Sequence, residues 1–121
     1  MTPIEITEAY KAVRELSGCI LPYRVTRELH HLKKRLTEEF EVIFESERSL
    51  VTKYGGKPTK QGAHFEHPED FEYFKDAYEA FMHQDAEVEL PKVNLAAYAD
   101  TLNISANAID ALEGLVIFEE V

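Results

Sequence analysis

The sequence predicts one α+β domain, mostly helical, that spans residues 1–121 and is organised around a long central helix. Three observations support this fold class. Apolar residues recur every three or four positions through residues 25–54, with no Gly or Pro between them. The same spacing recurs in shorter segments before and after that helix. Brief stretches in which polar and apolar residues alternate add a small sheet of two or three short strands.

Residues 3–17 are expected to form the first helix. Thr2 suits the N-cap, Pro3 the first helical position and Glu5 the third, which is the arrangement of a capping box. Its apolar face consists of Ile6, Ala9, Val13 and Leu16. The short apolar link at residues 19–22 predicts a buried corner that folds this helix back, antiparallel, onto the long helix.

The long helix is expected to start between Pro22 and Thr26 and to end at Gly55 and Gly56. Glycine enters the left-handed C-cap conformation without steric cost. About 28 residues at about 1.5 Å each give a rod of about 40 Å, which is longer than a domain of this size is wide. Other elements, or another chain, must therefore pack along it. Its apolar stripe is Val25, Leu29, Leu32, Leu36, Phe40, Ile43, Leu50 and Tyr54.

An aromatic helix is expected to begin at Pro68, after a polar loop at residues 57–62 and a short edge strand within residues 63–67. Acidic residues fill the first turn, where negative charge complements the helix dipole. Aromatic residues at helical spacing usually lie in a core, so we expect this stripe to pack against Phe40, Phe44 and Tyr54 of the long helix. The stripe consists of Phe71, Phe74, Tyr78, Phe81 and Met82.

The C-terminal region is expected to contain short elements. Residues 86–90 alternate in polarity and predict a second strand. Asn94 is expected to cap a short helix from Leu95, and Ser105 a further turn or two with Ile109 and Leu112 pointing inward. The apolar run at residues 115–118, after Gly114, is compatible with a third strand or with a buried helix.

Charge is distributed unevenly along the chain. The net charge is −10, with +2 on residues 1–60 and −12 on residues 61–121. This asymmetry argues against nucleic acid as a direct ligand of the acidic half, because phosphate contacts need cations. It permits a basic protein partner, or self-association between a mildly basic half and an acidic one.

Composition also bears on the compartment. No apolar run is long enough for a membrane span, and the N-terminal residues are not those of a secretory signal. The only cysteine, Cys19, excludes an intrachain disulfide and is expected to be a buried thiol. We therefore expect a cytoplasmic protein that does not bind membranes.

Catalytic and metal-binding patterns are absent from the sequence. It contains no Gly-x-Ser-x-Gly elbow and no HExxH motif, and GGKPTK lacks the spacing of a phosphate loop. His64 and His67 would face opposite ways on a strand, and His67 is expected to act as a helix cap. We therefore expect no catalytic residues, no metal site and no cofactor, so the chain is not expected to be an enzyme.

Several stretches resemble a group of small phage and prophage proteins of unknown function. A charged long helix ends in KYGG and is followed by PEDFEYFKDAYE, VELPKVNL and SANAIDALEGL. The specific stretches are residues 67–79, 88–95 and 105–115, and the general plan is similar from residue 25 onward. The resemblance implies accessory, assembly or anti-defence roles in a host cytoplasm. It implies no site residues.

These observations favour a protein–protein interaction protein that self-associates along the long helix. One alternative is an acidic mimic of nucleic acid that inhibits a host nucleic-acid-binding or defence protein. A second alternative is a small metal-dependent enzyme with a site at His64 and His67. The partner-binding face expected for the mimic consists of Glu69, Asp70, Glu72, Asp76 and Glu79.

Overall fold

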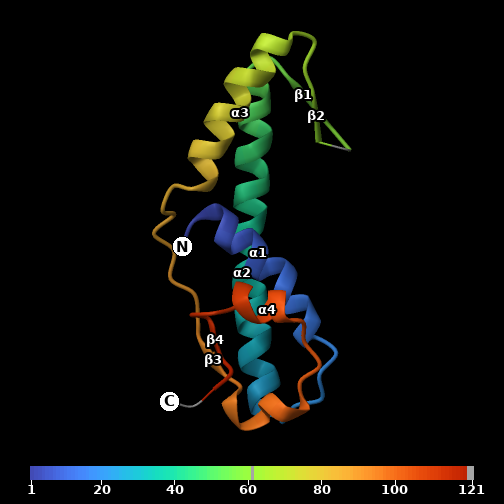
Figure 1. The fold of residues 1–121 in the computed structure, drawn as a ribbon, viewed down its shortest axis with the longest axis vertical. Coiled ribbons are helices and arrows are strands. Elements are labelled where there is room, and N and C mark those ends of the chain that lie inside the picture. The colour runs from blue at the N-terminus through green and yellow to red at the C-terminus, as the bar shows by residue number, and fades with distance from the viewer. Residues whose placement is uncertain (61, 120–121) are drawn as a thin grey trace.

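One helix runs along the length of the molecule, and the remaining elements gather around its two halves (Figure 1). A computed structural model describes residues 1–60 and 62–119. α1, α4 and the β3–β4 pair surround one half of α2, whereas α3 and the β1–β2 hairpin lie at its other end. The elements are α1 (Pro3–Val13), η1 (Arg14–Leu16), α2 (Tyr23–Lys53), β1 (Lys57–Thr59), β2 (Gly62–His64), α3 (Pro68–Met82), β3 (Val93–Asn94), η2 (Ala96–Thr101), α4 (Ala106–Ala111) and β4 (Val116–Ile117). The predicted fold class, mostly α with small sheets, is confirmed.

The long helix α2 forms as predicted. It has 31 residues, begins directly after Pro22 and ends before Tyr54. Gly55 then adopts a φ of +83°, and the amide of Gly56 donates a hydrogen bond to the carbonyl of Val51 at 2.9 Å. These contacts satisfy part of the exposed carbonyl end of the helix.

α1 begins with the predicted capping box. The amide of Glu5 donates to Oγ1 of Thr2 at 3.3 Å, and the amide of Thr2 donates to Oε1 of Glu5 at 3.0 Å. The predicted buried corner after this helix is wrong in part, because Ile20 is 98% exposed and Cys19 is only half-buried. Cys19 and Leu21 of the link pack, partly buried, against the core, whereas Ile20 between them points into solvent.

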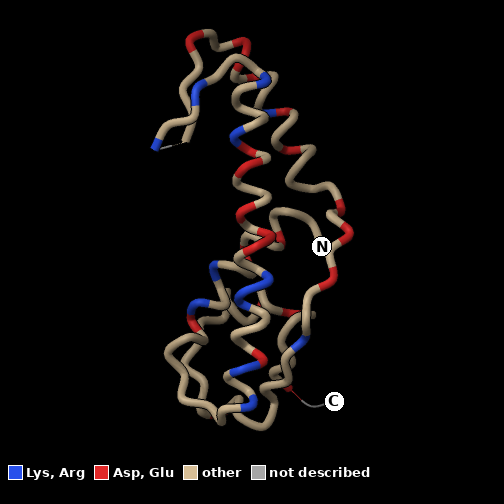
Figure 2. The backbone as a smooth tube through the Cα atoms, turned by 180° about the vertical axis from the view of Figure 1, so that it is seen from behind, with Lys and Arg blue, Asp and Glu red and all other residues tan. Residues whose placement is uncertain are grey.

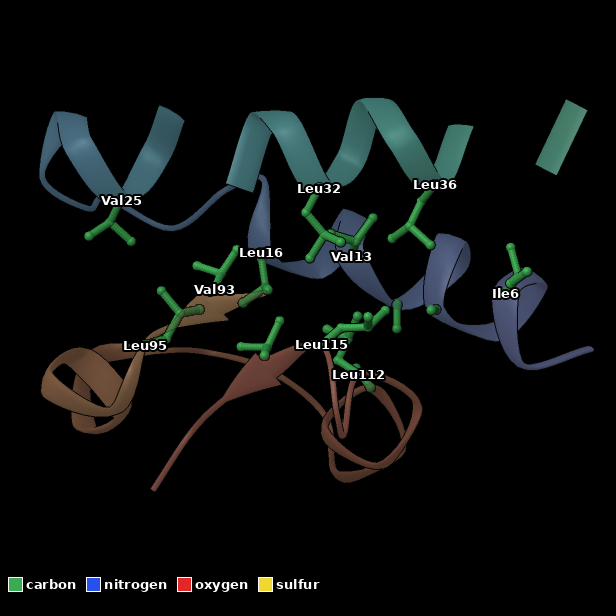
Figure 3. Packing of buried hydrophobic residues seen from close by; sticks show 14 of the residues in the cluster. Ile6, Val13, Leu16, Val25, Leu32, Leu36, Val93, Leu95, Leu112 and Leu115 are labelled. Carbon is green, nitrogen blue, oxygen red and sulfur yellow. The ribbon is translucent and has the colours of Figure 1, made fainter. Parts of the chain in front are cut away.

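The hydrophobic core lies between α1, the first half of α2 and the C-terminal elements (Figure 3). Leu32 and Leu36 point from α2 toward Val13 and Leu16. Opposite them lie residues that follow α3 in the chain, and these close the core from the other side. They are Val93, Leu95, Leu112 and Leu115.

The strands form two separate pairs. β1 and β2 are antiparallel, with Lys57 opposite His64, so the expected polar loop at residues 57–62 contains a hairpin strand. β3 and β4 are parallel, with Val93 opposite Val116, which resolves the run at residues 115–118 as containing a strand. The strand predicted at residues 86–90 is wrong, because this segment has no regular secondary structure. Its residues alternate in polarity as in a strand, but none of the described strands pairs with it.

Side-chain caps hold the short C-terminal elements in place. Oγ of Ser105 accepts the amide of Ala108 at 3.2 Å, as expected for an N-cap. Asn94 is not the N-cap that was expected, because η2 begins one residue later with Leu95 as its N-cap, but Oδ1 of Asn94 accepts the amide of Ala96 at 3.0 Å. The amide and hydroxyl of Ser105 also donate to the Glu15 carboxylate at 3.0 and 2.9 Å, which ties α4 to the end of the first helical segment.

The expected inward face of the α4 segment is only partly correct. Leu112 is fully buried, as expected. Ile109 is 38% exposed, and Ala108 takes the inward position instead. Close packing of α4 against α1 favours the small side chain at the point of contact.

Candidate functional site

An aromatic groove of about 830 Å³ lies between the C-terminal part of α2, the hairpin and α3. It is larger than four other hollows on the described part of the chain, which measure about 210, 480, 530 and 650 Å³. Five aromatic side chains line it, together with two cations and one carboxylate. The lining residues are Phe44, Glu47, Arg48, Val51, Pro58, Thr59, Lys60, Gly62, Ala63, Phe65, Phe71, Phe74 and Tyr78.

Helical spacing places the groove residues of α2 and α3. Phe44, Glu47 and Val51 follow one another at intervals of three and four residues, so they share one face of α2. Phe71, Phe74 and Tyr78 do the same on α3. The two faces are turned toward the same space, with the hairpin along one side.

A glycine lets the segment between the hairpin and α3 close over the end of α2. The Phe65 ring lies directly against Gly56, where a Cβ atom would be 2.5 Å from the ring carbon Cε1. From there Phe65 contacts Phe71 edge-on at a centroid distance of 5.8 Å and Phe74 at 5.2 Å. Phe74 in turn lies 5.7 Å from Tyr78, so the rings form a continuous row.

Only part of the aromatic stripe of α3 joins the core that its spacing predicts. Met82 is buried in the core, and Tyr78 and Phe81 pack against it, whereas Phe71 is 45% exposed. Two of the residues of α2 that were expected to pack against this stripe have other surroundings. The ring of Phe40 stacks on the ring of Tyr10 of α1, with 4.3 Å between the ring centroids, and Phe44 is 45% exposed. α1 and the C-terminal elements stop short of this end of α2, so no other segment of the described chain covers the row.

Two positively charged side chains and one carboxyl group line the groove, so positive charge predominates there. Burial raises the pKa of the Glu47 carboxyl group, and a hydrogen bond from Oη of Tyr78 at 3.3 Å offsets part of that rise. Burial and the nearby Glu47 carboxylate likewise raise the pKa of the Tyr78 phenol. Arg48 lies 5.8 Å from the centroid of the Phe44 ring, and Lys60 lines the hairpin side. An apolar ligand that carries a carboxylate therefore suits the groove.

The acidic residues predicted as a partner-binding face do not all lie together. Glu69, Glu72, Asp76 and Glu79 are exposed and spaced three, four and three residues apart, so they form one stripe on α3. Figure 2 marks the acidic positions along the backbone of this helix in red. That stripe faces away from the aromatic row on the same helix. Asp70 is placed differently: it is half-buried, and a Cβ atom on Gly55 would lie 3.2 Å from its carboxylate.

The histidines considered for a metal site are exposed. His64 ends β2, and His67 is the N-cap residue of α3, but its side chain makes no capping hydrogen bond, so the expected side-chain cap is wrong. Within residues 1–60 and 62–119, no group of three or more His, Cys, Asp or Glu side chains is arranged to hold a metal ion. No described helix combines the length and apolar character needed to cross a membrane.

Comparison with known proteins adds no functional assignment. No protein-family model matches the chain, and neither curated proteins nor solved structures give a match. The groove and the charged helix faces therefore carry the functional argument.

Sequence reasoning missed Phe44, Phe65 and Arg48 as members of one site. One signal was present in the sequence: Phe44 lies one position beyond the apolar stripe of α2, where a large aromatic residue is not needed for the core.

Proposed function

We propose that this chain is a non-enzymatic protein-interaction protein whose aromatic groove binds an apolar, acidic segment of a partner protein. The observation that carries the proposal is the uncovered row of aromatic rings between α2, α3 and the hairpin. Following the resemblance of the sequence to phage and prophage proteins, we place this role among phage accessory or assembly functions.

Two properties of the groove support a protein segment as its occupant. Half-exposed Phe44 and Phe71 present flat apolar surfaces, which contribute strongly to binding when a partner covers them. Arg48 and Lys60 add positive charge to the same groove, whereas its one carboxylate, Glu47, is half-buried and bonded to Tyr78. The partner segment should therefore carry large apolar side chains next to Asp or Glu.

Selection of peptides from a random library tests this proposal. Binders enriched on the wild-type protein should contain aromatic or aliphatic residues flanked by carboxylates. A variant with Phe44→Ser and Phe71→Ser should bind those peptides at least about tenfold more weakly, because two exposed anchors are removed. Circular dichroism checks that the variant stays folded.

The matched control is Tyr73→Ser, which removes an aromatic ring that is 65% exposed on the same helix but lies outside the groove. Binding to the control should equal binding to the wild type. Peptides that bind the Phe44→Ser, Phe71→Ser variant as tightly as the wild type would overturn the proposal.

The acidic stripe of α3 supports a second candidate function, mimicry of nucleic acid. Its four carboxylates are exposed and extend along about 15 Å of helix at about 1.5 Å per residue. A nucleic-acid-binding protein captured from host lysate should be displaced by DNA or by salt. Glu72→Lys with Asp76→Lys should abolish that capture, and Asp100→Lys, far along the chain on η2, should not. Capture that DNA does not displace would contradict mimicry.

A further inference from the structure

We propose that α2 also pairs, antiparallel, with α2 of a second copy of this chain. The contact is made by a charged seam on the outer face of the helix. The seam consists of Arg27, His31, Lys34, Glu38, Glu41 and Glu45. This inference uses a surface other than the aromatic groove, with which the seam shares no residue.

The seam has the spacing of a helix–helix contact. Its members follow one another at intervals of 4, 3, 4, 3 and 4 residues, which keeps one face of a helix against a partner helix. All six side chains are exposed, and they lie on the side of α2 opposite the buried stripe of Leu32, Leu36 and Ile43. Because α2 is unbroken from Tyr23 to Lys53, the seam is straight and continuous.

Charge along the seam is self-complementary in one direction only. Its first three positions are Arg, His and Lys, and its last three are Glu. Figure 2 shows Lys and Arg mainly along the first part of α2 and Asp and Glu along its middle, with further Lys and Arg near its C-terminal end. An antiparallel two-fold axis between Lys34 and Glu38 places these two opposite one another. The same axis places Arg27 opposite Glu45 and His31 opposite Glu41. A parallel pair would place each charge opposite its own copy.

Other antiparallel registers fit less well. If one helix slides by seven residues so that the two-fold axis moves toward the C-terminus of α2, Glu38 lies opposite Glu41. If it slides by seven residues in the other direction, His31 lies opposite Lys34. Only the register centred between residues 34 and 38 pairs every basic position with a carboxylate. Like charges facing one another oppose the shifted registers and so specify this one.

Most of the seam charges have no ion-pair partner within the described chain. Arg27, Lys34, Glu41 and Glu45 form no ion pair there, and Glu38 is bonded to Arg35 at 3.1 Å through one carboxylate oxygen. A carboxylate accepts more than one cation, so Glu38 can bind Arg35 and a lysine of the second copy together.

Apolar contacts are available at the ends of the same register. Val42 is 60% exposed beside the seam, and the acidic half of the seam lines a shallow groove of about 650 Å³ with Leu50 and Phe81. Tyr23 is 81% exposed at the start of α2, and in this register it lies opposite Ser49, which lines that groove. Two such contacts, one for each copy, add apolar burial to the charge pairing.

Two charge-reversed proteins test the proposal. The acidic variant carries Arg27→Glu and Lys34→Glu, and the basic variant carries Glu38→Lys and Glu45→Lys. Sedimentation velocity at about 100 µM protein in about 50 mM salt should show dimers of the wild type and monomers of either variant alone. A mixture of the two variants should form a heterodimer, because every charge then faces its opposite.

The control carries Glu72→Lys and Asp76→Lys on α3, which change the net charge as much as the basic variant does. It should still dimerise. A wild type that remains monomeric, or a mixture of the two variants that stays monomeric while both are folded, would overturn the proposal. Peptide binding to the aromatic groove is unaffected by either result, so the two surfaces can fail independently.

Discussion

The two ends of α2 carry apolar residues at similar spacing but differ in what covers them. In the first half, Leu32 and Leu36 are fully buried by α1 and by the segments around β3 and α4. Beyond Ile43, Val51 is the only described residue of α2 that is buried, and it is not part of the core cluster. Phe44 remains 45% exposed there, across the groove from Phe71.

Helical spacing predicts which residues share one face of a helix, but it does not predict whether that face is buried. A stripe becomes core only where a second segment closes over it, as residues 93–116 do at the first half of α2. At the other end, α2, α3 and the hairpin line a groove that no further segment of the described chain covers. The same residue types therefore stabilise the fold at one end and offer a binding surface at the other.

Truncating a buried side chain in the first half of α2 should destabilise the protein more than any other change considered below. Leu36→Ala should lower the free energy of unfolding by about 2–5 kcal/mol, because it leaves a cavity in a closed core. Urea denaturation measures this change. Val42→Ala, on the same helix but 60% exposed, is the control and should change stability by less than about 0.5 kcal/mol. Equal losses in the two variants would remove the contrast between the faces of α2.

A smaller loss is expected where the hairpin closes over the end of α2. Gly56→Ala should cost about 1–3 kcal/mol, because the new methyl group meets the Phe65 ring. Gly18→Ala is the control, since no atom beyond its chain neighbours lies within 4 Å of a Cβ there. The melting temperatures of the two variants are compared with that of the wild type. If Gly56→Ala melts at the same temperature as the wild type, the Phe65 ring does not pack against Gly56.

The uncovered end should tolerate the loss of a whole aromatic ring. Phe71→Ala should cost less than about 1.5 kcal/mol, because much of the ring is already in water. The measurement is the same urea titration as for Leu36→Ala. A loss as large as that of Leu36→Ala would show that the row behaves as a core and not as a binding surface.

The smallest expected effect is a gain in stability. The pKa of Glu47 is raised in the folded chain, so above its ordinary value of 4.5 the folded state holds the proton more firmly than the unfolded state does. Stability therefore decreases as the pH rises from 4.5 through the raised pKa. Glu47→Gln should remove that decrease and raise stability at pH 7 by less than about 1 kcal/mol, with no gain near pH 4.

Melting temperatures of the wild type and of Glu47→Gln, compared between about pH 4 and pH 7, measure this effect. Glutamine keeps an oxygen that can accept the Tyr78 hydroxyl, so the contact itself is retained. Glu72→Gln on the exposed stripe of α3 is the control and should show no such gain. A variant that is less stable than the wild type at pH 7 would contradict the interpretation of Glu47.

Local signals predicted the helices well. The capping box of Thr2 and Glu5, the glycines after α2 and the proline before α3 act within a few residues of each helix end, so they can be recognised in the sequence. Strands were predicted less well because a strand needs a neighbour. Residues 86–90 have the right alternation but no partner, whereas Val93 pairs with Val116 across more than twenty residues.

The candidate site was harder to predict for the same reason. Phe44, Phe65 and Phe74 come from three separate segments, and only the folded chain brings them to one groove. The acidic stripe follows from helical spacing and was predicted, except for Asp70, whose carboxylate lies beside Gly55 at the end of α2. The charged seam of α2 is also readable from spacing, once the structure shows which face is free.

The hydrogen bonds between Glu15 and Ser105 join parts of the protein that are synthesised at very different times. They join residues 90 positions apart, and the core beside them is completed by Leu112 and Leu115, which are synthesised long after Val13, Leu32 and Leu36. Until then the nascent chain presents Val13, Leu32 and Leu36 without their cover. This half can therefore fold only after residues 93–116 have been synthesised, and until then its apolar residues are exposed to chaperones and proteases.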